Sequence, residues 1–174
     1  MRAIEDEREE RDGKESRQRV KTPDKALQDL MRYAARAERS SGDALRLMRR
    51  WGIGEVDRRQ ILEKLQRQHF IDDERFAEAY VREKTRLAGW GIHKIRAGLR
   101  MKGIAPALIE RVTQVLSDQR PDNKQRLAEL LARKRRSLKE TDVYKVKDKL
   151  IRFGMSRGFD YEDVADVVQQ VLQD

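Results

Sequence analysis

Apolar side chains recur every three or four residues over most of the chain, which is the period of an amphipathic α-helix. The pattern is clearest over residues 74–124, where glycine or proline separates three successive apolar stripes. The stripes are Phe76, Ala77, Tyr80 and Val81; Ile92, Ile95 and Leu99; and Ile109, Val112, Val115 and Leu116. Each stripe lies along one side of a helix, so the pattern predicts three consecutive helices.

This three-helix pattern occurs three times. A large aliphatic residue is followed by a glycine four positions later at 48–53, 99–104 and 150–155, and the glycines are Gly52, Gly103 and Gly154, 51 residues apart. A fixed period of this length is typical of repeat proteins. We therefore predict an all-α fold in which three repeats stack into an elongated array that can curve. The predicted organisation is a tail over 1–22, followed by repeats over 23–73, 74–124 and 125–174.

Capping residues fix the expected ends of the helices. Asp72 precedes the first helix of the second repeat, with Asp73 and then Phe76 in its first turn, and Thr22 precedes Pro23 in the first repeat. Because a left-handed residue often ends a helix and glycine adopts that conformation at little cost, each recurrent glycine is expected just after its second helix. The acidic residues 72–74 are better explained as a helix start than as a metal site.

The N-terminal tail has a different composition from the repeats. Residues 1–22 contain seven basic and seven acidic side chains and very few large aliphatic ones. Such a segment cannot bury a core, so it is expected to be disordered or a frayed helix.

Charge and composition exclude several classes of protein. The chain has 40 Lys and Arg against 31 Asp and Glu, a net charge of +9, and no cysteine. No stretch approaches the roughly 18 to 20 uncharged apolar residues of a membrane span, and the N-terminus lacks the apolar core of a secretion signal. The absence of cysteine excludes disulfides and thiolate metal sites and suits the cytoplasm, which is our expected location.

Catalytic motifs are absent from the sequence. There is no phosphate-binding loop, no serine nucleophile motif and no zinc-protease motif, and Gly89 and Gly91 lack the preceding strand of a dinucleotide site. His69 and His93 have no neighbouring acid or nucleophile in the sequence and are expected to have ordinary polar roles. We therefore expect no enzyme activity, no cofactor and no metal, and we disfavour a metal-dependent phosphodiesterase.

The positive charge is concentrated in the middle of the chain. Residues 74–157 hold 22 basic and ten acidic side chains, whereas 158–174 hold five acids and no base. Arg96 and Arg100 point about 100° away from the apolar stripe of their helix. The predicted partner-facing strip consists of Arg46, Arg49, Arg50, Arg96, Arg100, Lys102, Lys134, Arg135, Arg136, Lys145, Lys147, Lys149 and Arg152. It suits contacts with phosphates or with an acidic protein, and a purely solvated surface is the alternative.

Three aromatic residues could stack on nucleic-acid bases or close the helix ends. Trp51 and Phe153 precede Gly52 and Gly154, where a hydrophobic contact with the end of the helix is the simpler interpretation. Trp90 lies between two glycines in a predicted turn, and this position fits an internal plug and a partner contact equally well.

The second repeat contains three distinctive segments, Phe70-Ile-Asp-Asp-Glu-Arg-Phe-Ala77, Gly89-Trp-Gly-Ile-His-Lys-Ile95 and Leu99-Arg-Met-Lys-Gly-Ile104. In these segments the chain resembles the RecX family, the bacterial regulators of the RecA recombinase. The resemblance is strongest over 61–116 and extends more weakly over 26–172. The first repeat departs from the family pattern, because it reads Ser41-Gly-Asp-Ala-Leu45 where a Ser-x-x-Glu-Leu sequence is common.

The resemblance implies a non-enzymatic protein that binds in the groove of the RecA nucleoprotein filament and inhibits its extension. Strand exchange, ATP hydrolysis and the SOS coprotease activity of RecA would then fall, with effects on DNA repair and recombination. We expect a monomer that contacts single- or double-stranded DNA. The alternative is a helical repeat protein that binds DNA or RNA without sequence specificity and acts without RecA.

Overall fold

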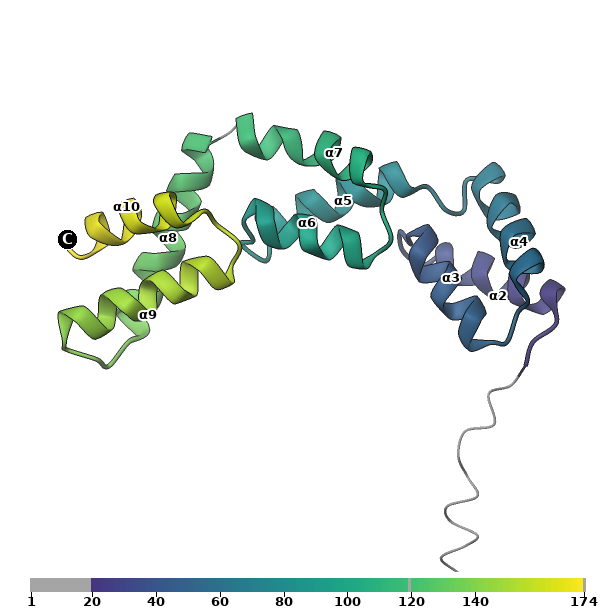
Figure 1. Cartoon of the computed structure of the whole chain (residues 1–174), viewed down its shortest axis with the longest axis horizontal. Helices are drawn as coiled ribbons and strands as arrows, with labels where there is room; N and C mark the ends of the chain where they lie inside the picture. Colours follow the sequence, from purple (N-terminus) through teal and green to yellow (C-terminus); the bar gives the residue numbers. More distant parts are fainter. Residues whose placement is uncertain (1–19, 119, 174) are drawn as a thin grey trace, which may run out of the picture. The chain divides into compact units, whose positions relative to one another are not determined.

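The computed structural model describes residues 20–118 and 120–173 (Figure 1). These residues form nine helices and no strand, which confirms the predicted all-α fold. None of these helices has the length and apolarity needed to cross a membrane. The predicted tail lies almost entirely outside the described residues. The described chain divides into two compact units, a first unit of 20–37 with 43–71 and a second unit of 38–42 with 72–173.

The first triplet of helices is α2 (Pro23–Ala34), α3 (Ser41–Arg50) and α4 (Glu55–Arg67), and all of it except the first two residues of α3 lies in the first unit. Pro23 begins α2, and the Thr22 hydroxyl accepts a hydrogen bond from the Lys25 amide, so the predicted cap is confirmed. The three helices enclose one apolar core. Its fully buried side chains include Leu30 from α2, Met48 from α3 and Leu65 from α4.

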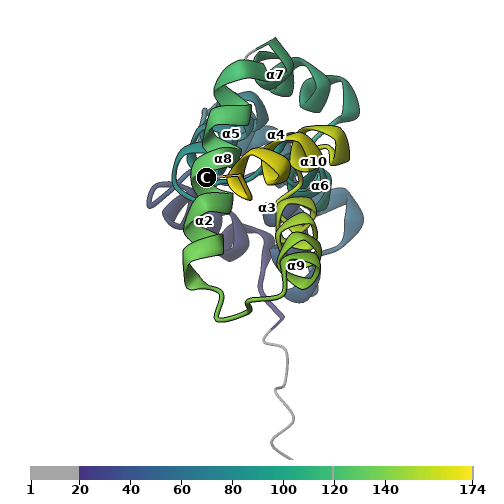
Figure 2. The same cartoon turned by 90° about the vertical axis from the view of Figure 1, so that its left-hand side faces the viewer.

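The second unit contains two further triplets, each with its own core. The second triplet is α5 (Asp73–Arg86), α6 (Ile92–Met101) and α7 (Pro106–Asp118), and the third is α8 (Arg120–Ser137), α9 (Val143–Ser156) and α10 (Tyr161–Val171). Ile95, Leu99 and Ile109 fill the second core, and Leu131, Leu150 and Val164 are among those that fill the third. Figure 2 shows α10 bridging α8 and α9, and it packs against both.

Carboxylates cap the helices of the second unit as the sequence indicates. The Asp72 carboxylate accepts a hydrogen bond from the Arg75 amide at 3.0 Å, and Asp73 and Glu74 follow in the first turn of α5. Asp142 accepts hydrogen bonds from the amides of Tyr144 and Lys145 at the start of α9. Phe76 is buried in the second core one turn after its cap.

Left-handed glycines end α3, α6 and α9, but the third is not the residue that the repeat predicts. Gly52 (φ +71°) and Gly103 (φ +77°) confirm the expectation. The expectation for Gly154 is wrong, because α9 continues to Ser156 and Gly158 (φ +85°) takes the left-handed conformation. The residue after each left-handed glycine donates its amide to a carbonyl five residues back, as in a Schellman motif. These pairs are Ile53 to Met48, Ile104 to Leu99 and Phe159 to Gly154.

Gly154 has a packing role in place of a capping role. It is buried within α9, and a Cβ added there would lie 2.8 Å from both γ carbons of Val164 on α10. The missing side chain therefore lets α9 and α10 approach closely. Gly154 is the structural counterpart of Met48 and Leu99. Each of the three lies five residues before the apolar residue that follows the left-handed glycine and accepts the hydrogen bond from its amide.

Replacing Gly52 isolates the cost of the left-handed backbone. A Cβ there would come no closer than 3.4 Å to Val20, an ordinary contact, so Gly52→Ala should lose about 1 kcal/mol through its positive φ alone. Gly52→Asn should lose less, because asparagine tolerates this conformation better. Urea unfolding followed by circular dichroism measures both changes. Equal losses for the two variants would contradict a conformational origin.

Asp29 on α2 is surrounded by three cations. Its carboxylate accepts a hydrogen bond from Lys21 at 2.8 Å, contacts Arg32, and lies 3.7 Å from the Lys25 ammonium. The hydrogen bond from Lys21, with the further hydrogen bond from Arg32, lowers the pKa of Asp29 from 3.8 to about 2. The ionised carboxylate is thus favoured by folding.

This depressed pKa predicts a specific acid sensitivity of the first unit. Since the folded pKa is lower than the unfolded one, the stabilisation is complete above about pH 4 and is lost as the pH falls towards 2. Asp29→Asn should therefore destabilise α2 at neutral pH, and the difference from wild type should vanish between about pH 4 and pH 2. Hydrogen exchange of the buried Leu30 amide measures this, and a difference that persists at pH 2 would argue against the assignment.

Candidate nucleic-acid interface

The Arg96 side chain is partly buried between α6 and α7 of the second triplet. Its Nε donates to the Thr113 hydroxyl at 2.9 Å and its Nη2 donates to the Glu110 carboxylate at 2.7 Å. Thr113 is fully buried on α7, and the Arg96 side chain is only 22% exposed. Arg96 is thus partly covered, because α7 packs along the flank of α6 from which Arg96 projects, and its place in the partner-facing strip stays a prediction.

Other cations of the predicted strip also have carboxylate partners. Arg46 pairs with Asp43 on α3, and Arg152 pairs with Asp148 on α9. Lys149 donates to Glu140 at 3.1 Å, and this hydrogen bond lowers the pKa of Glu140. These exposed pairs contribute little to stability, but they partly cancel the positive charge that a partner would meet.

The remaining cations of the strip differ in their exposure to solvent. Arg49 and Arg50 on α3, Arg100 on α6, Arg136 on α8 and Lys145 and Lys147 on α9 are exposed and have no carboxylate partner within the described chain. Lys134 and Arg135 are half-buried near the end of α8. Lys102 is half-buried at the end of α6, where its carbonyl oxygen accepts a hydrogen bond from the Ser40 hydroxyl. Their alignment into one continuous strip stays a prediction.

The structure adds three cations, Lys84, Lys94 and Arg157, to those that the sequence pattern singled out. Lys84 at the end of α5 and Lys94 in the first turn of α6 both lie against the Trp90 ring. Arg157, directly after α9, lies against the Phe153 ring together with Lys134 of the predicted strip. We call Lys84, Lys94, Lys134 and Arg157, with Trp90 and Phe153, the junction cluster. The sequence pointed to Lys134 and to the two aromatic residues but not to the other three cations.

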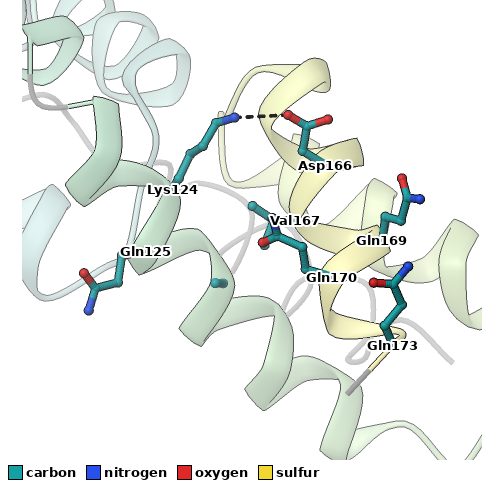
Figure 3. Close-up of a pocket in the computed structure, with 8 residues that line it drawn as sticks. Lys124, Gln125, Asp166, Val167, Gln169, Gln170 and Gln173 are labelled. Atoms are coloured by element: carbon teal, nitrogen blue, oxygen red, sulfur yellow. Dashed lines mark hydrogen bonds and ion pairs between the residues drawn. The ribbon is translucent and has the colours of Figure 1, made fainter.

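One hollow of the second unit is lined by charged side chains that pair with each other. This hollow, of about 430 Å³ between α8 and α10, is lined by Lys124, Asp166 and several glutamines (Figure 3). Hydrogen bonds to Asp166 and Asp163 hold the Lys124 ammonium and raise its pKa. Its cation is therefore neutralised internally. Within the described residues no three His, Asp or Glu side chains are placed to hold a metal ion.

Comparison with known proteins places these features in a family. A model described as "RecX, second three-helix domain" matches residues 72–112, and one described as "RecX, third three-helix domain" matches residues 122–168. Regulatory protein RecX of Clostridium botulinum (strain Eklund 17B / Type B) is 31% identical over 156 residues, which cover 88% of this chain and 69% of the relative. Regulatory protein RecX of Chlorobium phaeobacteroides (strain BS1) is 31% identical over 153 residues, 87% of this chain and 97% of that one.

Solved structures agree on the fold. The crystal structure of RecX from Lactobacillus salivarius has a TM-score of 0.71 at 21% identity, covering 87% of this chain and 97% of its own. The described helices and their exposed cations thus define an all-α repeat protein with a basic surface. The chain belongs to the RecX family of regulatory proteins.

Two neighbouring arginines on α6 should respond differently to truncation. Arg96→Ala leaves buried Thr113 without its donor and should cost about 1 kcal/mol of stability. Arg100→Ala removes an exposed side chain and should change stability by less than about 0.5 kcal/mol. Thermal unfolding of both variants checks this prediction. An Arg96→Ala variant as stable as wild type would mean that the hydrogen bonds of Arg96 to α7 do not stabilise the fold.

Proposed function

We propose that this chain binds the RecA nucleoprotein filament and inhibits its extension, as a non-enzymatic regulator of recombination and of the SOS response in the cytoplasm. The observation that carries the proposal is its membership of the RecX family, supported by matches to two successive three-helix domains and by relatives named as regulatory proteins. The protein acts as a monomer in this proposal, since each triplet buries its own apolar core.

The exposed cations supply the chemistry for such a partner. A RecA filament presents DNA phosphates together with protein surface, and Arg100, Lys145 and Lys147 are exposed cations with no internal carboxylate partner. Phosphate contacts provide affinity without sequence reading, which suits a regulator that must act wherever a filament forms. Exposed Met101, beside Arg100, adds apolar surface that a protein partner could cover.

The proposal predicts an effect on RecA at low molar ratio. Added to RecA on single-stranded DNA with ATP, the protein should lower steady-state ATP hydrolysis when present at fewer copies than RecA, because blocking the growth of one filament affects many subunits. A coupled ATPase assay measures the effect. An ATPase rate unchanged even at molar excess would remove RecA regulation and leave DNA or RNA binding as the function.

A matched pair of variants locates the effect on the surface. Arg100→Gln, Lys145→Gln and Lys147→Gln together should weaken inhibition without changing helix content, since all three side chains are exposed. Arg59→Gln with Lys64→Gln and Arg67→Gln removes the same charge from the exposed surface of α4 and serves as the control. Equal inhibition by both triple variants would place the RecA-binding surface elsewhere.

A further inference from the structure

Two aromatic rings in the second unit each hold two cations in place. The Lys94 ammonium lies 4.8 Å from the Trp90 ring centre, and the Lys84 ammonium lies 5.5 Å from it. The Phe153 ring centre lies 5.0 Å from the Arg157 guanidinium carbon and 5.5 Å from the Lys134 ammonium. Attraction to a ring face restrains a long side chain, so these cations lose less conformational entropy when they bind an anion.

Two hydrogen bonds between the second and third triplets connect the cations at one ring with the cations at the other. Lys94 on α6 donates to the carbonyl of Ser156 on α9 at 3.0 Å, and Arg157 donates to the carbonyl of Ala88 before α6 at 3.0 Å. The two hydrogen bonds are reciprocal, because each triplet contributes one cation and one carbonyl. The junction cluster is therefore one site built from α5, α6, α8 and α9.

The charge of this site is not neutralised by the protein. Among the described residues, only Lys84 of its four cations contacts a carboxylate, that of the exposed Glu83 at 2.6 Å. Lys94 and Arg157 bond to carbonyl oxygens, which accept a hydrogen bond but carry no formal charge. The nearby Asp160 carboxylate is engaged with His93 at 2.7 Å. Four cations gathered beside one another repel each other unless an anion lies between them.

We propose that the junction cluster binds the phosphodiester backbone of single-stranded DNA and holds the second and third triplets together when it does so. The occupant follows from the site, because clustered, restrained cations with ring faces already covered by lysine and arginine favour phosphates over bases. A strand can also place several phosphates along cations contributed by four helices. The inference rests on the proposed function in one respect: that function identifies the bound DNA as the single strand inside the RecA filament.

Glutamine substitutions remove the charges of the site in two separate pairs. Lys94→Gln with Arg157→Gln removes two charges together with the hydrogen bonds to the Ser156 and Ala88 carbonyls, because glutamine is shorter than lysine and arginine. Lys84→Gln with Lys134→Gln removes two charges that make no hydrogen bond across the junction. The control is Arg59→Gln with Lys64→Gln on α4, which matches the change in charge.

The measurement is fluorescence anisotropy of a labelled oligo-dT strand over a range of salt concentrations. Each junction variant should bind at least tenfold more weakly than the control, with a log-log salt slope shallower by about 1.4, which corresponds to two phosphate contacts at about 0.7 each. Slopes equal to that of the control in both junction variants would overturn the proposal. Displacement of the strand by millimolar inorganic phosphate at constant ionic strength would also overturn it, since the ligand would then be a free anion.

The RecA ATPase assay on the same variants separates this inference from the proposed function. If wild type leaves RecA unaffected but the salt slopes shift as expected, the DNA site stands and RecA regulation fails. If the junction variants lose inhibition of RecA while their oligo-dT affinity and slope match the control, the cluster meets an acidic protein surface and the DNA site is wrong. Circular dichroism of each variant shows that the triplets remain folded.

Discussion

A direct contact between two backbones fixes the geometry of the second unit. The Gly91 amide donates to the Arg157 carbonyl at 2.8 Å, and the His93 amide donates to the Gly158 carbonyl at 3.1 Å. A Cβ at Gly91 would overlap the Gly158 carbonyl, and a Cβ at Gly158 would overlap the backbone of Lys94. The contact thus requires glycine on both sides. The position of α6 against the end of α9, and with it the junction cluster, depends on this joint.

Much of the fold follows from local signals in the sequence. The apolar period predicts the helices, and Thr22, Asp72, Gly52 and Gly103 mark helix ends that the structure confirms. The third repeat shows the limit of the method. Gly158 lies four residues beyond Gly154, and four residues are close to one helical turn, so the apolar stripe keeps its phase and the shift cannot be seen in the pattern.

The candidate site was less predictable, because it depends on contacts between elements. A helical wheel shows that Arg96 leaves the apolar stripe of α6 but not that α7 covers that flank with Thr113 and Glu110. Arg157 and Ala88 are 69 positions apart, and they meet only through the packing of the second and third triplets. Counting charges along the sequence identified a basic region. Which of its side chains lack a carboxylate partner can be read only from the contacts in the structure.

The backbone contact at Gly91 and Gly158 also affects how a repeat protein of this kind can gain further repeats. Within the second unit a close approach of two backbones occurs again, since a Cβ at Gly42 would overlap the Lys102 carbonyl, next to Gly103. The second repeat therefore carries both complementary halves, Gly91 at the start of α6 and Gly103 after its end. Because the contact is made by backbone groups and glycines, duplicating one repeat would also copy both surfaces needed to pack against the next repeat. The surrounding side chains could then change without disrupting this contact.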